Sequence, residues 1–145
     1  MVKQFAEVRP QILIRRIYPH PVPAVWRAIA TGKGLSAWLM PTLGFRPVIG
    51  TAFTFTTQRY GRFDGTVHCR VVDIEVNRLI SYTWSSNVLP ETVVSFEIKE
   101  ISPNQTLLIL SHHGFSGFKG WFTKVILRLG WRNLLRKKLA KYLKI

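Results

Sequence analysis

Hydrophobic and polar residues alternate with a period of two through the middle of the chain, the pattern of strands that bury one face. Phe53 and Phe55 alternate with threonines soon after Gly50. The same alternation predicts five more strands, over residues 11–18, 63–74, 79–84, 92–101 and 105–112. Short turn segments separate neighbouring strands after Gly50, so about six strands are expected to form an antiparallel sheet joined mainly by hairpins.

Two helical segments are predicted between the first and second strands. Val22, Val25, Trp26 and Ile29 have the spacing of one helix face, and they follow prolines of the kind that a first helical turn tolerates. A short helical turn follows and ends at Pro41. Because helices do not alternate regularly with strands, a parallel sheet is not expected.

The longest predicted helix, residues 118–143, carries its apolar residues in two stripes. The first stripe runs from Trp121 to Leu129 and the second from Trp131 to Leu143, with Gly130 between them as a point where a helix bends or breaks at low cost. A rotation of about 100° per residue turns the second stripe away from the first. A helix with two apolar stripes must hide both, and one sheet hides only one of them. The first is expected to cover a cavity mouth or to form a dimer or membrane contact.

Composition favours one domain with a sizeable core. The 145 residues are 47% hydrophobic, so we expect a single domain over residues 1–145. Cys69 is the only cysteine, which excludes an internal disulfide framework and fits a reducing compartment. The start of the sequence lacks the apolar run of a secretory signal, and no apolar run approaches the roughly 20 residues of a membrane span. A cytoplasmic location is therefore expected.

Positive charge is concentrated toward the end of the chain. There are 21 Lys and Arg against 7 Asp and Glu, a net charge of +14, and Glu100 is the last acidic residue. An anionic membrane surface or an acidic protein is therefore an expected partner, and nucleic acid is the weaker alternative. A solvated helix face is the competing interpretation. The predicted interaction surface consists of Trp121, Phe122, Lys124, Arg128, Arg132, Arg136 and Lys137.

Short motifs in a fixed order point to a family. They are His20-Pro21, Val25-Trp26-Arg27-Ala28, Trp38 with Pro41, Phe63-Asp64-Gly65-Thr66-Val67, Tyr82-Thr83-Trp84, His113-Gly114-Phe115 and Gly130-Trp131. In this order they resemble the family related to the C-terminal part of the activator of the Hsp90 ATPase, within the START-like superfamily. The resemblance implies an α+β helix-grip fold, in which a curved antiparallel sheet wraps around a long C-terminal helix and can leave an internal cavity. It also implies that this helix buries the second stripe, with Trp131, Leu135 and Leu139, against the sheet.

Such a cavity would have mainly aromatic walls. Apolar walls with few polar groups suit a small apolar or amphipathic molecule. The competing interpretation is that these aromatic residues simply fill the core. The expected ligand-binding residues are Trp38, Met40, Phe53, Phe55, Phe63, Tyr82, Trp84, Phe96 and His112.

The sequence contains no persuasive catalytic or metal-binding pattern. His68 and Cys69 are adjacent on a predicted strand and point to opposite faces, as do His112 and His113, so a three-ligand site is not expected. Asp64 lies beside a glycine, where capping of a turn is expected. Some START-like relatives are cyclases or hydrolases, and for that alternative the candidate residues are His112, Tyr82 and Asp64.

The expected function is therefore non-enzymatic binding of a small hydrophobic or amphipathic ligand, without a cofactor or metal. Two alternatives stay open. One is an Hsp90-associated or other protein-interaction module that acts through the basic C-terminal face, and the other is a cyclase- or hydrolase-like enzyme. A homodimer is a further expectation.

Overall fold

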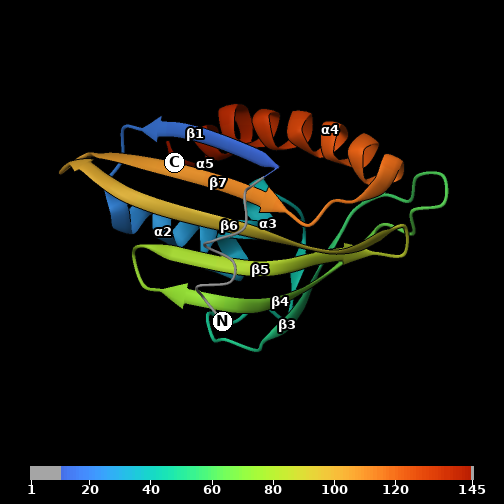
Figure 1. Ribbon diagram of the computed structural model, residues 1–145. Coiled ribbons are helices and arrows are strands. Elements are labelled where there is room, and N and C mark those ends of the chain that lie inside the picture. Colours follow the sequence, from blue (N-terminus) through green and yellow to red (C-terminus); the bar gives the residue numbers. More distant parts are fainter. Residues whose placement is uncertain (1–10, 145) are drawn as a thin grey trace.

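The computed structural model describes residues 11–144, and of residues 118–122 it describes the backbone alone. The strands form one antiparallel sheet in the order β1-β7-β6-β5-β4-β3-β2, so β1 and β2 are its edges (Figure 1). They are β1 (Ile12–Tyr18), β2 (Thr42–Leu43), β3 (Ala52–Thr56), β4 (Thr66–Glu75), β5 (Leu79–Ser86), β6 (Leu89–Ser102) and β7 (Gln105–His113). The predicted antiparallel sheet is confirmed, and the two-residue strand β2 is the one that alternation did not reveal.

The helices lie on one side of the sheet (Figure 1). Between β1 and β2 the chain forms the two predicted short helices, and after β7 it forms one long helical segment. No helix in the described part of the chain is long and apolar enough to cross a membrane. A curved sheet that holds a C-terminal helix is the predicted helix-grip fold. The helices are α2 (Val22–Ile29), α3 (Gly32–Trp38), α4 (Gly117–Asn133), the π-helix η1 (Leu134–Leu139) and α5 (Ala140–Leu143).

The C-terminal helix does not break at Gly130, because α4 continues through it to Asn133. A π-helical segment follows instead. In an α-helix, residues four apart advance about 40° beyond a full turn, so a row at this spacing drifts around the helix. The wider turns of η1 counteract that drift. Four residues at this spacing, which belong to the second apolar stripe, therefore all face the core: Trp131, Leu135, Leu139 and Leu143.

Gly34 allows α2 and α3 to approach closely. A Cβ at this position would lie 2.5 Å from the carbonyl oxygen of Arg27 and 2.8 Å from Cα of Ala28, and these backbone atoms cannot rotate away. We expect Gly34→Ala to lower the free energy of unfolding by about 1–3 kcal/mol, as overpacking does. The matched control is Gly130→Ala, because a Cβ at Gly130 meets nothing within 4 Å.

Gly130→Ala is expected to raise the free energy of unfolding by about 0.5–1 kcal/mol, since alanine costs less backbone entropy in a helix. Urea denaturation measures both variants. Effects of the same sign and size would contradict the close approach at Gly34.

Candidate ligand-binding site

An apolar pocket lies at the end of the sheet, between the β5–β6 turn and α4, with a volume of about 290 Å³. Val88 and Ile126 line it and are 50% and 54% exposed, so the pocket reaches solvent there. Its polar lining groups are the hydroxyl-bearing residues Thr57, Ser86 and Thr123. The remaining walls are formed by Met40, Phe63, Val67, Trp84, Leu89 and Leu127.

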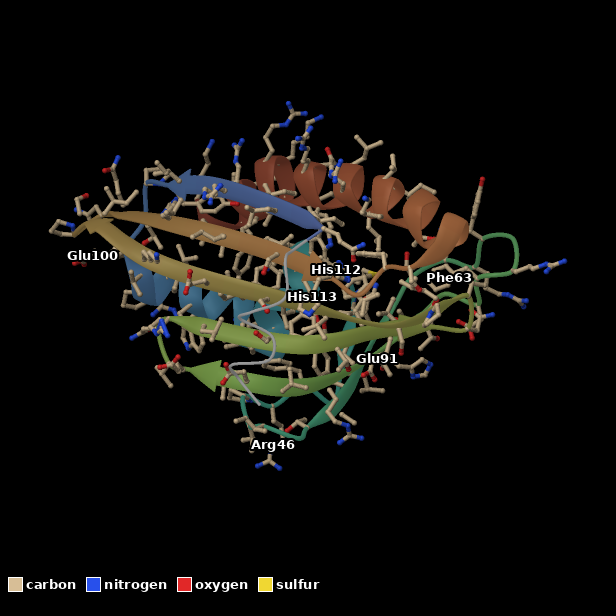
Figure 2. All side chains as sticks on the ribbon, in the orientation of Figure 1. Arg46, Phe63, Glu91, Glu100, His112 and His113 are labelled. Carbon is tan, nitrogen blue, oxygen red and sulfur yellow. The ribbon has the colours of Figure 1, made fainter. Side chains whose placement is uncertain are left out.

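Hydrogen bonds fix the loop that carries Phe63 against the β5–β6 turn. The side chain of Asn87 accepts a hydrogen bond from the Asp64 amide (3.1 Å) and donates one to the carbonyl of Arg62 (2.7 Å). The Asp64 carboxylate accepts from the Thr66 amide at 2.9 Å, which is the predicted turn-capping role. Figure 2 shows the result, with Phe63 at the end of the sheet beside the first turns of α4.

The predicted ligand-binding residues divide between this pocket and the core. Met40, Phe63 and Trp84 line the pocket. The side chain of Trp38 is instead buried, and its Nε1 donates to the carbonyl of Ala28 at 2.8 Å. The other aromatic members also pack within the core, as Phe53, Phe55, Tyr82 and Phe96.

These core rings contact one another where an internal ligand was expected. The ring centroids of Phe53 and Tyr82 are 5.2 Å apart, and those of Phe55 and Trp84 are 5.6 Å apart. Trp131 of α4 closes the cluster, with its ring 5.3 Å from that of Trp84 and 5.8 Å from that of Phe96. Such separations are typical of packed aromatic pairs. The rings therefore fill the space between sheet and helix, and the pocket lies at their edge.

His112 was expected to bind a ligand, but its side chain is fully buried and does not line the apolar pocket. Its Nδ1 accepts from Nε1 of Trp131 at 3.2 Å, and its Nε2 lies 2.7 Å from Oγ1 of Thr92. The Thr92 hydroxyl donates to the carbonyl of Trp84 at 2.7 Å, so Nε2–H of His112 is the donor to Thr92. Burial, and secondarily the charge of His113, lowers the pKa of His112 to about 3.

The three residues considered for catalysis do not converge. Tyr82 is buried in the aromatic cluster, and its hydroxyl has no hydrogen-bond partner among the described residues. Burial raises its pKa, and burial also raises the pKa of the Cys69 thiol, so both groups stay protonated near neutral pH. Both ring nitrogens of His112 form hydrogen bonds, one with Thr92 and the other with Trp131. Asp64 caps an exposed turn. His68 on β4 and His112 on β7 are separated in the sheet by β5 and β6, so these two histidines do not meet.

Sequence reasoning missed part of the pocket wall. Val67 lies two residues before Cys69 on the buried face of β4, and alternation could have assigned it there. Leu89 follows the β5–β6 turn and is buried. Ile126 belongs to the first apolar stripe of the C-terminal helix, which was expected to cover a cavity mouth, and it lines the pocket. Leu127, which was not assigned to that stripe, lines the pocket as well.

The predicted interaction surface is only partly described, because the side chains of Trp121 and Phe122 lie outside the described residues. Lys124 is half-buried, and Lys137 is exposed. Arg128 donates from Nη2 to the carbonyl of Gln11 at 3.0 Å, which ties α4 to the start of β1. Arg132 and Arg136 are exposed and lie together in a groove beside β1.

Comparisons with known proteins agree with the observed fold. A family model described as activator of Hsp90 ATPase homolog 1-like protein matches residues 19–144. No curated protein matches the sequence. Among solved structures, the chain is similar to protein MLL2253 from Mesorhizobium loti, with 25% identity over 92% of this chain and 96% of that chain and a TM-score of 0.81.

Two further structures share the fold. The crystal structure of CalU16 from Micromonospora echinospora is 23% identical over 90% of this chain and 71% of that chain, with a TM-score of 0.71. The Aha1 dimer from Colwellia psychrerythraea is 19% identical over 90% of this chain and 97% of that chain, also with a TM-score of 0.71. A homodimer of the present chain stays a prediction. The match of the family model over most of the sequence shows that the chain belongs to the family of activator of Hsp90 ATPase homolog 1-like proteins.

Proposed function

We propose that this protein binds a compact apolar or amphipathic molecule in the pocket between the end of the sheet and α4. The observation that carries the proposal is the lining, in which apolar side chains such as Phe63, Trp84 and Leu127 surround a space of about 290 Å³. Small-molecule sites are apolar clefts of roughly 300–1,000 Å³ with a few polar groups. The volume is at the low end of that range, so it favours a compact ligand.

The position of the pocket supports reversible entry. Val88 on the β5–β6 turn and Ile126 on α4 are each about half exposed, so a ligand reaches the pocket without unfolding the aromatic cluster. The surface that faces the pocket is almost entirely apolar, so the part of the ligand that enters it is expected to be apolar. Binding is preferred to catalysis because Tyr82, His112 and Asp64 contribute nothing to the described lining.

Ile126→Trp tests the site by filling it from the rim. We expect the variant to reduce the affinity for N-phenylnaphthylamine, a neutral apolar fluorescent probe, by at least about tenfold, because an indole occupies volume that the probe needs. One tenfold step corresponds to about 1.4 kcal/mol of binding free energy. The measurement is a fluorescence titration of the natural protein and the variant.

The matched control is Leu129→Trp, one helical turn further along α4. Leu129 is 62% exposed, close to the 54% of Ile126, but it does not line the pocket. This control is expected to bind the probe as the natural protein does. Failure of the natural protein to bind the probe, or equal losses in the two variants, would count against the pocket as the site.

A further inference from the structure

A second groove, which we name the arginine groove, lies between the edge strand β1 and the C-terminal helix. Its volume is about 470 Å³. It is separate from the apolar pocket, since the two share no lining residue. The residues that characterise it are Leu13, Arg15, Arg16, Leu129, Arg132 and Arg136.

The fold brings these four arginines together from the two ends of the chain. Arg15 and Arg16 are adjacent on β1, so their side chains leave opposite faces of the sheet. Both line the groove because β1 is an edge strand, which among the described strands pairs with β7 alone. The other side of β1 is therefore free to meet the helix, and Figure 1 shows α4 running beside it. Arg132 and Arg136 are four residues apart, so they project from the same side of the helix.

No carboxylate within the described residues neutralises these four arginines. The described ion pairs involve Arg78 and Lys99 with Glu75 and Glu97, on the β4–β6 part of the sheet. In addition, Nε of Arg16 is buried without a hydrogen-bond partner among the described residues. Gathering like charges in one concave site is unfavourable for the isolated protein and raises the local positive potential, which attracts anions.

Exposed apolar side chains flank the same groove. Leu13 and Ile17 lie on the outward face of β1 and are 45% and 57% exposed, and Leu129 on α4 is 62% exposed. Arginines next to exposed apolar residues are typical of a protein surface that binds at a membrane interface. None of the described residues that line the groove is aromatic, so none of them offers a ring on which a nucleotide base could stack.

We infer that the arginine groove binds the phosphate group of an anionic phospholipid at a membrane surface, with Leu13 and Leu129 in contact with the lipid beside it. The planar guanidinium group donates two parallel hydrogen bonds to phosphate oxygens, which favours arginine over lysine at such a site. The bound phosphate supplies the negative charge that the described protein residues lack here. The site is independent of the apolar pocket and of its ligand.

The test is cosedimentation with vesicles of phosphatidylcholine alone and of phosphatidylcholine with phosphatidic acid. We expect binding to the second kind only. The double variant R132Q/R136Q is expected to weaken it about 25-fold, from about fivefold for each arginine at an anionic membrane surface. Both residues are exposed, so the variant is expected to unfold at the same temperature as the natural protein, which circular dichroism checks.

The matched control is K138Q/K141Q, which removes the same charge from exposed positions of the same helix that do not line the groove. It is expected to weaken binding less than about fivefold, because these lysines contribute only to the general field. The charge-preserving variant R132K/R136K is expected to bind at an intermediate level, since lysine lacks the guanidinium fork.

Four results would overturn the inference. The first is no binding to phosphatidic acid vesicles, and the second is equal loss in the glutamine variants of the arginine and lysine pairs. The third is binding of soluble glycerol phosphate, lost in R132Q/R136Q, without binding to vesicles, which would make a soluble phosphate compound the ligand. The fourth is displacement from vesicles by a single-stranded oligonucleotide at equal phosphate concentration, which would favour a nucleic acid.

Discussion

Replacing Trp131 with alanine is expected to lower the free energy of unfolding by about 3–5 kcal/mol, the usual cost of deleting a large buried aromatic side chain. The side chain is only 2% exposed and lies against Trp84 and Phe96. It is also the point at which the C-terminal helix enters the aromatic cluster. Since domains of this size are stable by roughly 5–15 kcal/mol, the loss is a large fraction of the total. Urea denaturation followed by circular dichroism measures it.

A second variant separates packing from hydrogen bonding. Trp131→Phe keeps a ring in the cluster but removes the Nε1–H that donates to Nδ1 of His112 at 3.2 Å. It is expected to cost about 1–3 kcal/mol, because a buried acceptor is left unpaired and some volume is lost. A loss below about 1 kcal/mol for Trp131→Ala would contradict the view that this residue joins the helix to the sheet.

The fold was predictable because its signals are local. Alternation of the kind seen at Phe53 and Phe55 depends only on neighbouring residues, and each hairpin pairs strands that are adjacent in sequence. The second apolar stripe of the C-terminal helix was placed in the core because of the resemblance to a helix-grip family, and Trp131, Leu135 and Leu139 are buried there. The strand β2 escaped notice because two residues are too short to show a period.

The candidate sites were less predictable because they depend on packing between distant segments. Alternation places Tyr82 and Phe96 on the inner face of the sheet, but it does not tell whether their rings meet or leave a space. In the structure the ring of Phe96 packs against those of Tyr82 and Trp131, and the rings fill the space. The arginine groove was even harder to predict from the sequence. Arg15 and Arg132 are near opposite ends of the sequence and become neighbours only when the helix lies beside β1.

The buried hydrogen bonds of His112 with Trp131 and Thr92 make the stability of the protein dependent on pH. In the folded protein burial lowers the pKa of His112 to about 3, from an ordinary value of 6.5. The Nδ1 atom that would take the proton already faces the Nε1–H donor of Trp131, so the protonated ring would place two donors against each other. Burial lowers the pKa of His113 as well. Both histidines therefore oppose folding when they are protonated.

The free energy of unfolding is expected to have its full value above pH 6.5 and to decrease as the pH drops from 6.5 toward about 3. In that window the unfolded chain binds a proton at His112 and the folded chain does not, so acid favours unfolding. The shift from 6.5 to about 3 corresponds to a maximum of about 5 kcal/mol, and about half of this is expected to be lost near the middle of the window. Urea denaturation at a series of pH values measures the slope.

His112→Gln identifies the residue responsible. Glutamine does not titrate, so the variant is expected to be less stable than the natural protein at neutral pH, where it loses hydrogen bonds to Trp131 and Thr92, yet to lose much less stability on acidification. His113, whose pKa burial also lowers, would contribute to the remaining slope. The two stability curves should converge as the pH falls, because the penalty of burying an imidazole grows in one protein and is missing in the other. Parallel curves would show that acid acts elsewhere in the molecule and that His112 is only a packing residue.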